Sequence, residues 1–331
     1  MGLSQITASL YAQHNQSVFE RFPVTGLIST PSSSHLITDS AAGATAFSCG
    51  CKTYNGAIGV NSRKKPCKTL FEIADSLQLA TGIAVNCTVT HATPASFVAH
   101  VHSRKEMEEI APWFLINQVD FLVGGGAKYF GGAAYFGPGQ TPKANLLDKM
   151  RAAGYVISQN AFDTLPANPD PKQPFCWLTA SEEPPKATAG RNYLPAITAM
   201  GTRFLQERNA GRGFIMLIEG SQVDWAGHGN DRDWLLAEMK DFENSIAAAL
   251  DFARQDGETL VVVTADHETG GMSILQGSSM DTLDLHFNTK GHTASMIPIF
   301  AYGPGAELFG GIYENTGVFD RLLRLLTSAR Q

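Results

Sequence analysis

Residues 38–46 read Thr-Asp-Ser-Ala-Ala-Gly-Ala-Thr-Ala, a run of small residues that begins with Thr38, Asp39 and Ser40. An aspartate or a serine directly before such a run is typical of the start of a helix. The free backbone N–H groups and the positive dipole end of a helix start attract an anion. The stretch therefore predicts either a simple helix cap or a reactive hydroxyl, that of Ser40, placed beside a bound anion.

The composition of the whole chain favours a globular protein that binds a small molecule. The 331 residues are 44% hydrophobic, which is enough for a large core. The net charge of −6, with no basic run longer than residues 63–65, argues against nucleic acid as the main partner. No apolar run reaches the roughly 20 residues that cross a bilayer, and the N-terminus lacks the pattern of a signal peptide. We therefore expect a small-molecule substrate and no membrane span in this chain.

The cysteines are too few and too scattered to form a disulfide framework. They are Cys49, Cys51, Cys67, Cys87 and Cys176. The first two enclose a single glycine, and no second pair follows them at the spacing of a zinc knuckle. We expect ordinary thiols, with one bridge at most.

Short apolar runs alternate with amphipathic segments along the chain. Five runs are typical of buried parallel strands: 82–85, 119–123, 213–218, 260–263 and 296–300. Helical patterns lie between them, at 69–79, 144–153, 194–208 and 233–254. The alternation predicts an α/β fold with a doubly wound, mostly parallel central sheet and helices on both faces. We expect a single domain over residues 1–331, with a Gly- and Pro-rich, loop-rich excursion at about 128–195.

Polar residues cluster where these strands end. Open α/β sheets bind their ligands at the carboxyl ends of the strands, so residues that follow different strands meet there. The residues concerned are His91 and Thr93 after the first strand, Glu219, Asp224 and His228 after the third, Asp266 and His267 after the fourth, and His292 just before the fifth.

The residue types in these clusters are those that bind zinc and magnesium, and a catalytic zinc has about three protein ligands and one open position. Asp224, His228 and His292 would form one such set. Asp266 and His267 would form most of a second. The alternative is that each cluster is a capped turn or a surface loop. That alternative has to hold independently at four strand ends, so we favour metal binding.

Five motifs give the chain a clear resemblance to the alkaline phosphatase family. They are the stretch 38–46, HATP at 91–94 with VAHVHSR at 98–104, EGSQVD at 219–224 with His228, TADHE at 264–268, and GHTA at 291–294. They follow the family's order and span nearly the whole chain.

The resemblance implies hydrolysis of phosphate monoesters with two Zn²⁺ ions and one Mg²⁺. In that scheme Ser40 is the nucleophile that becomes phosphoserine, and Arg104 holds two phosphate oxygens. The implied metal ligands are Asp224, His228 and His292 at the first zinc, Asp266 and His267 at the second, and Glu219 and Thr93 at the magnesium-type site, where His91 also lies. A metal lowers the pKa of a serine hydroxyl, and a guanidinium donates two parallel hydrogen bonds to phosphate.

The chain departs from the family pattern in two places. His91 stands where some members have aspartate, and Trp225 where some have lysine, which we expect to change the occupancy of the third site without changing the reaction. In the family, a strand ending in Gly-Asp-Gly precedes the equivalent of Met1-Gly2, and its aspartate bridges two metals. We therefore expect the first strand of the domain to be missing here, with weaker metal loading and lower stability.

Other readings remain open. One alternative function is that of a phosphodiesterase of the same superfamily, although such an enzyme would be expected to lack the third metal site and the arginine that binds phosphate. A metal-binding chain with impaired turnover is another, because the upstream aspartate is absent. A sulfatase is disfavoured, since residues 40–44 lack the Pro and Arg of its motif. Family resemblance also implies a periplasmic or extracellular location and a possible homodimer.

Overall fold

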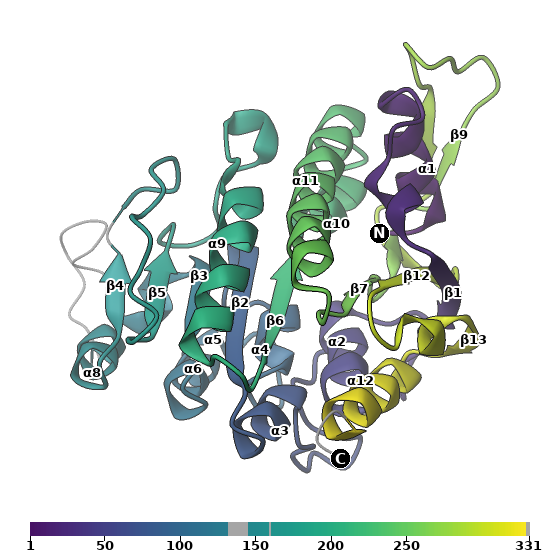
Figure 1. Ribbon diagram of the computed structural model, residues 1–331. Coiled ribbons are helices and arrows are strands. Elements are labelled where there is room, and N and C mark those ends of the chain that lie inside the picture. Colours follow the sequence, from purple (N-terminus) through teal and green to yellow (C-terminus); the bar gives the residue numbers. More distant parts are fainter. Residues whose placement is uncertain (132–144, 159, 329–331) are drawn as a thin grey trace.

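The computed structural model describes residues 1–131, 145–158 and 160–328, and its centre is a five-stranded parallel sheet (Figure 1). The strand order is β4-β5-β3-β2-β6, and every neighbouring pair is parallel. The strands are β2 (Ala80–Thr88), β3 (Phe121–Gly125), β4 (Val156–Ser158), β5 (Phe175–Leu178) and β6 (Phe214–Glu219). The α/β fold with a mostly parallel, helix-flanked sheet is therefore confirmed.

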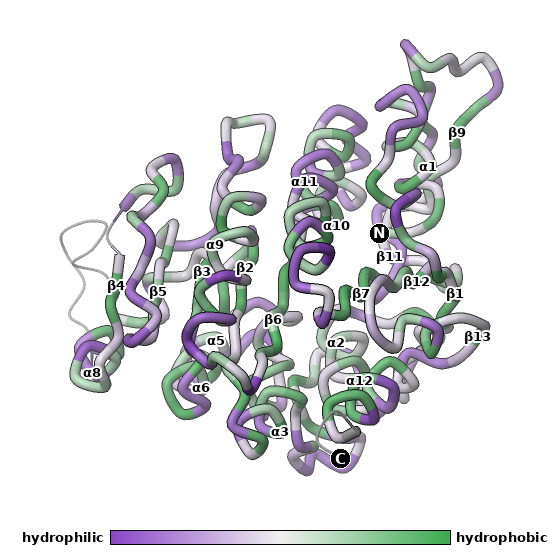
Figure 2. The backbone as a smooth tube through the Cα atoms, viewed as in Figure 1, coloured by the Kyte–Doolittle hydropathy of each residue, from purple (hydrophilic) through white to green (hydrophobic). Residues whose placement is uncertain are grey.

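Helices cover both faces of this sheet because its central strands are apolar on both sides. All nine residues of β2 are buried, and Figure 2 shows β2 and β3 as mainly hydrophobic. Ile83 and Val85 pack into one core cluster with α2, α3 and α6, whereas Ala84 packs into another with α9. A strand buried on both faces needs apolar residues at consecutive positions, which is why these runs do not alternate.

The described helices connect and surround the strands. They are α1 (Leu3–Ala12), α2 (Ser40–Cys49), α3 (Leu70–Ser76), α4 (Ala92–Ser96), α5 (Met107–Ile110), α6 (Pro112–Ile116), α8 (Leu146–Ala152), α9 (Tyr193–Arg208), α10 (Gln222–Gly229), α11 (Arg232–Asp256) and α12 (Thr316–Ser328), with 3₁₀ turns η1 (Val18–Arg21), η2 (Ala127–Phe130), η3 (Ala187–Ala189) and η4 (Ala306–Phe309). None of the described helices is long and apolar enough to cross a membrane.

A second, mixed sheet has the order β13-β1-β12-β7. Its strands are β1 (Val24–Ser29), β7 (Val261–Val263), β12 (Ile297–Tyr302) and β13 (Gly311–Glu314). The strand β12 runs antiparallel to both β1 and β7, so the expectation that 260–263 and 296–300 are parallel strands was wrong. The chain passes from β7 to β12 through short ribbons without a crossover helix, and a parallel pair would need such a crossover.

Two short antiparallel ribbons fill the connection between β7 and β12. The first pairs β8 (Glu268–Thr269) with β11 (His292–Thr293), and the second pairs β9 (Met272–Ile274) with β10 (Leu285–Phe287). The second ribbon projects beside α1 (Figure 1). The strands β6 and β7 are each the last strand of their sheet, and most of their residues are only partly buried.

Part of the expected excursion at 128–195 lies outside the described residues, namely 132–144 and 159. Its described part contributes α8, η3 and the strands β4 and β5, which extend the parallel sheet. The extent of the single domain stays a prediction.

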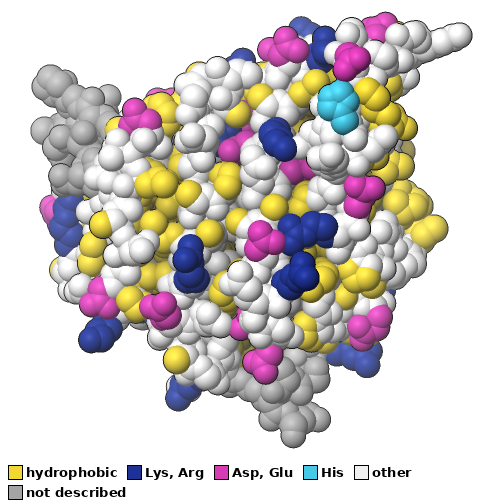
Figure 3. Space-filling view, turned by 45° about the horizontal axis from the view of Figure 1, so that its top comes forward, with side chains coloured by type: hydrophobic (Ala, Val, Ile, Leu, Met, Phe, Trp, Pro, Cys, Tyr) yellow, Lys and Arg dark blue, Asp and Glu magenta, His cyan; other side chains and the backbone are white. Residues whose placement is uncertain are grey.

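The cysteines behave as the sequence predicts. Cys51 and Cys67 form one disulfide, and the other three are buried free thiols. Figure 3 shows acidic and basic side chains mixed over the face that it presents, without a large patch of one sign.

Candidate active site

Ser40 is the first residue of α2, and Asp39 caps this helix. The carboxylate of Asp39 accepts hydrogen bonds from the backbone N–H groups of Ala42 and Gly56, both at 3.0 Å. The small-residue run is needed because α2 is almost fully buried. A Cβ at Gly43 would lie 2.7 Å from the Cβ of Asp266. The run therefore lets the helix approach the loop that follows β7.

The structure brings the residues from several strand ends together around Ser40. The Ser40 hydroxyl lies 3.1 Å from Nε2 of His267, and the same nitrogen lies 3.1 Å from Oδ2 of Asp266. The ring of His267 stacks on that of His292, with centroids 3.4 Å apart. Asp224, from α10, completes the cluster, and its ligand atom lies within 4.8 Å of those of His267 and His292.

The histidines at this cluster are oriented by backbone carbonyl groups. Nδ1 of His292 lies 2.9 Å from the carbonyl oxygen of Thr38, and Nδ1 of His228 bonds the carbonyl oxygen of Lys290. A carbonyl oxygen only accepts, so each Nδ1 carries the hydrogen, and each Nε2 of a neutral ring presents a lone pair.

When both rings are neutral, as metal binding requires, these two lone pairs face each other, because the Nε2 atoms of His228 and His292 are 3.1 Å apart. Both also lie near the carboxylate of Asp224, at 3.4 Å for His228 and 3.6 Å for His292. Zinc with Zn–N bonds of 2.0–2.1 Å in tetrahedral geometry holds two nitrogens about 3.3 Å apart. The donor set and its spacing therefore fit a zinc-type cation.

The pKa values of Asp224 and Asp266 are low although both side chains are partly buried. Burial alone raises a carboxyl pKa. Against it, the hydrogen bond to His228 and the charge of His267 hold the pKa of Asp224 well below its usual range. At Asp266, burial is again opposed, mainly by the charge and hydrogen bond of His267, so its pKa is also low. The hydrogen bond with Asp224 in turn raises the pKa of His228 to about 9.

Glu219, Thr93 and His91 lie on the other side of the cluster. Desolvation raises the pKa of Glu219 at the end of β6 to about 7, although the nearby hydroxyl groups of Ser221 and Thr93 oppose the shift. Burial, with the charge of Arg104, lowers the pKa of His91 to about 4. Nδ1 of His91 has no partner among the described residues, and its ring lies edge-on to that of Trp225.

Arg104 reaches the start of α2 from the segment after α4. Its Nη1 donates to Oδ2 of Asp39 at 3.1 Å, and its Nη2 lies 3.1 Å from Nε2 of His91. The guanidinium therefore lies beside the cap of the helix that carries Ser40, as an anion-binding role requires.

Two residues at the site were not found by sequence reasoning. Thr269 donates its hydroxyl hydrogen to Oδ1 of Asp224 and lies 3.2 Å from Nδ1 of His267. Glu268 is buried behind the ribbon β8–β11. Their only sequence signal is their position directly after His267. Every predicted site residue lies in this region, while their individual roles stay predictions.

The comparisons with known proteins agree with this fold. The family described as "Alkaline phosphatase" matches residues 1–284. "Alkaline phosphatase 3" of Bacillus subtilis (strain 168) is 32% identical, over 98% of this chain and 87% of that protein. The alkaline phosphatase of the Antarctic bacterium TAB5 has a TM-score of 0.90 and 39% identity, over 99% of this chain and 95% of that chain. A variant of it, solved with Mg in its M3 site, has a TM-score of 0.89 and 39% identity over the same shares.

The chain belongs to the alkaline phosphatase family. It is therefore a phosphatase enzyme that hydrolyses phosphate monoesters.

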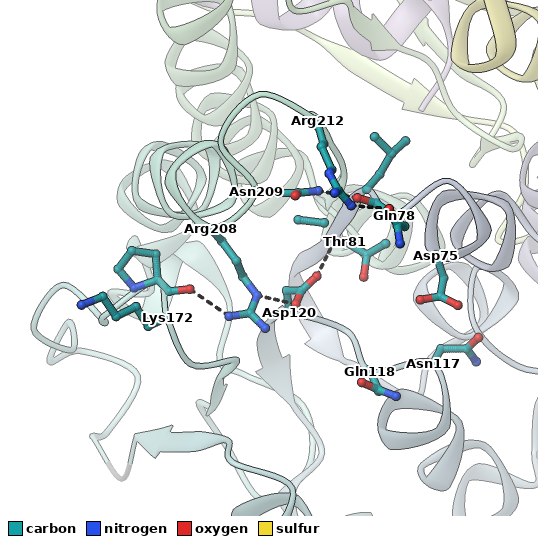
Figure 4. Close-up of a pocket in the computed structure, with 13 residues that line it drawn as sticks. Asp75, Gln78, Thr81, Asn117, Gln118, Asp120, Lys172, Arg208, Asn209 and Arg212 are labelled. Carbon is teal, nitrogen blue, oxygen red and sulfur yellow. Dashed lines mark hydrogen bonds and ion pairs between the residues drawn. The ribbon is translucent and has the colours of Figure 1, made fainter. Parts of the chain in front are cut away.

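A separate hollow of about 430 Å³ lies at the amino ends of β2, β3 and β6, the opposite edge of the sheet from Ser40 (Figure 4). Its arginines are engaged within the protein. Arg208 donates to Asp120 and, at 2.8 Å, to the carbonyl oxygen of Pro171, and Arg212 donates to the Gln78 side chain. We assign this hollow no part in the reaction.

Proposed function

We propose that this phosphatase acts through a covalent phosphoserine at Ser40, at a site for two Zn²⁺ ions and one Mg²⁺. The observation that carries the proposal is the position of the Ser40 hydroxyl, at a helix start and 3.1 Å from Nε2 of His267 in a cluster of metal-type donors. A helix start favours the negative phosphoryl group.

The residues divide between three metal positions. Asp224, His228 and His292 would hold the first zinc, Asp266 and His267 the second, and Glu219 and Thr93, beside His91, the magnesium-type ion. The Mg-bound variant of the TAB5 enzyme supports a magnesium-type site in a similar fold. Bound zinc would lower the pKa of the Ser40 hydroxyl and stabilise the charge on the leaving oxygen.

The chain's own groups then act in two steps. In the first, Ser40 Oγ forms a bond to phosphorus while the bond to the leaving oxygen breaks on the opposite side. Arg104, beside Asp39, donates hydrogen bonds to two non-bridging oxygens. In the second step, water attacks the phosphoserine, the Oγ–P bond breaks, and phosphate leaves. The free N–H groups of α2 favour the phosphoryl charge throughout.

The intermediate can be trapped by incubating the zinc-loaded enzyme with radioactive phosphate at acidic pH and quenching in acid. The wild type should retain label, and Ser40→Ala should retain none. Ser48→Ala, which changes another serine of α2 that donates to the carbonyl oxygen of Ser96, should still be labelled. Label on Ser40→Ala would contradict the assignment.

The phosphodiesterase alternative is tested by the same preparation. Turnover of an aryl phosphate monoester should exceed that of a bis-aryl phosphate, because a diester has esterified one of the three non-bridging oxygens that Arg104 and the metal sites would contact. A preference for the diester would support the alternative.

We also propose a periplasmic or extracellular location. The disulfide between Cys51 and Cys67 supports it, since such bonds persist in oxidising compartments. A homodimer is proposed on family resemblance alone, and sedimentation of the purified protein tests it.

A further inference from the structure

The ribbon β8–β11 presents two different faces. Its register pairs His292 with Thr269, and Thr293 with Glu268. Side chains alternate between the faces of a strand, and directly paired residues share a face. Thr269 and His292 therefore face the metal-type donors, where Thr269 bonds to Asp224. Glu268 and Thr293 face away from them.

Glu268 is a buried carboxylate, 5% exposed, that binds four donors behind the ribbon. Oε1 accepts from Nε2 of Gln5 at 2.7 Å and from the N–H of Met272 at 3.4 Å. Oε2 accepts from the N–H of Gly271 at 3.2 Å and from the hydroxyl of Thr293. All four partners donate, so this position needs a group that only accepts, and an ionised carboxylate is such a group.

The carboxylate also joins the ribbon to α1. Gln5 donates a second hydrogen bond to the carbonyl oxygen of Thr269 at 2.9 Å and accepts one from the N–H of Gly2 at 2.8 Å. A Cβ at Gly2 would lie 2.5 Å from Cγ of Glu268, so the chain before α1 packs directly on this side chain. The back of the ribbon is thereby fixed to a helix.

We propose that Glu268 is a positioning residue that sets the zinc affinity of the site by holding His267 and His292 in register. This inference rests on the proposed metal site. Glu268 takes part in neither proposed reaction step, and its hydrogen bonds among the described residues go to Gln5, Gly271, Met272 and Thr293 rather than to an expected ligand side chain. Glu268 joins the two strands that carry or adjoin these ligands. His267 directly precedes Glu268 in the chain, and His292 directly precedes Thr293, whose hydroxyl group donates a hydrogen bond to Glu268. Without the hydrogen bonds of Glu268, we expect the stacked rings of His267 and His292 to lose the spacing that a cation needs.

The test is Glu268→Gln, which keeps the shape of the side chain but turns an NH₂ group toward donors. Zinc affinity of the refilled apoprotein is measured by competition with a chromophoric chelator, at a temperature well below unfolding. Loss of a group that orients metal ligands commonly costs 10–100-fold in affinity, and we expect a loss in that range.

Glu243→Gln is the matched control. Glu243 is also buried and accepts from the hydroxyl groups of Ser9 and Ser17 and from the N–H of Val18. It ties the same helix α1 and the turn η1 to α11, but its hydrogen bonds among the described residues go to Ser9, Ser17 and Val18 rather than to a residue beside the expected ligands. We expect Glu243→Gln to lower the melting temperature of the apoprotein while its zinc affinity stays within twofold of wild type.

A reciprocal exchange provides a rescue. In Gln5→Glu/Glu268→Gln the donor and acceptor trade places, so the hydrogen bond between positions 5 and 268 is restored in reverse. Zinc affinity should recover in part compared with Glu268→Gln alone. If Glu268→Gln does not fold, Thr293→Val decides the matter, since it removes one donor from the ribbon and should weaken zinc binding at least threefold.

The outcomes separate this inference from the proposed function. If the wild type binds no zinc, the metal assignment itself fails. If the wild type binds zinc and Glu268→Gln binds it within twofold as well, or loses no more affinity than Glu243→Gln, only the role of Glu268 is overturned.

Discussion

Nη1 of Arg104 donates to Oδ2 of Asp39 at 3.1 Å, which ties the guanidinium to the residue that caps the helix of Ser40. Asp39 thus serves two purposes. Its Oδ1 satisfies backbone N–H groups at the helix start, and its Oδ2 holds Arg104 beside the serine. The helix cap predicted for the stretch 38–46 is therefore confirmed, and it forms one hydrogen-bonded unit with the arginine for which we propose an anion-binding role.

Replacing Arg104 should weaken phosphate binding without removing metal. Hydrogen bonds to a charged group contribute about 1.5–3 kcal/mol, so Arg104→Ala should raise KM and the inhibition constant of inorganic phosphate about 10–100-fold. Zinc per chain, measured by mass spectrometry, should hold. Arg63→Ala, at an exposed position, is the control. Loss of zinc from Arg104→Ala would indicate a structural role instead.

Adding one methyl group to α2 should disturb the second metal position. Gly43→Ala places a Cβ 2.7 Å from that of Asp266, closer than real contacts allow. Either the helix or the Asp266 loop has to move, so we expect a clear loss of zinc and of kcat. Gly310→Ala is the control, because its new Cβ meets nothing nearer than 3.7 Å. Unchanged activity in Gly43→Ala would show that the loop adapts freely.

Removing the disulfide should lower stability. Cys51 and Cys67 are 16 residues apart, and closing a loop of this size contributes about 3 kcal/mol in the chain-entropy account. The double variant Cys51→Ser/Cys67→Ser should lose about that much unfolding free energy in urea.

Burial raises the pKa of the Cys49 thiol to about 12, so alkylation of the reduced, folded protein should label the two bridge cysteines and spare Cys49.

The pair of His100 and Glu72 should make stability depend on pH. Burial lowers the pKa of His100, but the hydrogen bonds with Glu72 and with the carbonyl oxygen of Gly59 and the charge of Glu72 together raise it. Burial raises the pKa of Glu72, but its hydrogen bonds with His100 and Thr69 and the nearby positive charges together lower it. The histidine's contribution is full below its unfolded pKa and is lost as the pH rises through its folded pKa. The carboxyl's contribution is full above its unfolded pKa and is lost as the pH falls.

The pair therefore stabilises the protein most between about pH 4.5 and 6.5, the unfolded values of the two groups. Thermal unfolding of the apoprotein, followed from pH 5 to 9, should show this contribution declining above neutrality. His100→Gln should flatten that part of the profile, and an unaltered profile would refute the pairing.

The amino-acid sequence by itself determined the fold class and the location of the site. Strands buried on both faces need consecutive apolar residues, so β2 and β3 could be predicted directly from the runs at 82–85 and 119–123. The apolar run at 213–218 indicated β6 as well, although this edge strand is only partly buried. In a parallel sheet the strand ends meet at one edge. Residues far apart in the sequence, such as Thr93 after β2 and Glu219 at the end of β6, could therefore be expected to lie near each other.

Only the tertiary structure decided the pairing of β12 and the contacts that orient the expected metal ligands. A strand's apolar pattern does not record the direction of its neighbour, so β12 could not be recognised as antiparallel to β1 and β7. The bonds from Arg104 to Asp39 and from Gln5 to Glu268 join segments far apart in the chain. Such bonds depend on side-chain geometry after packing, which the spacing of residues along the chain does not determine, and they fix the positions of the side chains at the proposed site.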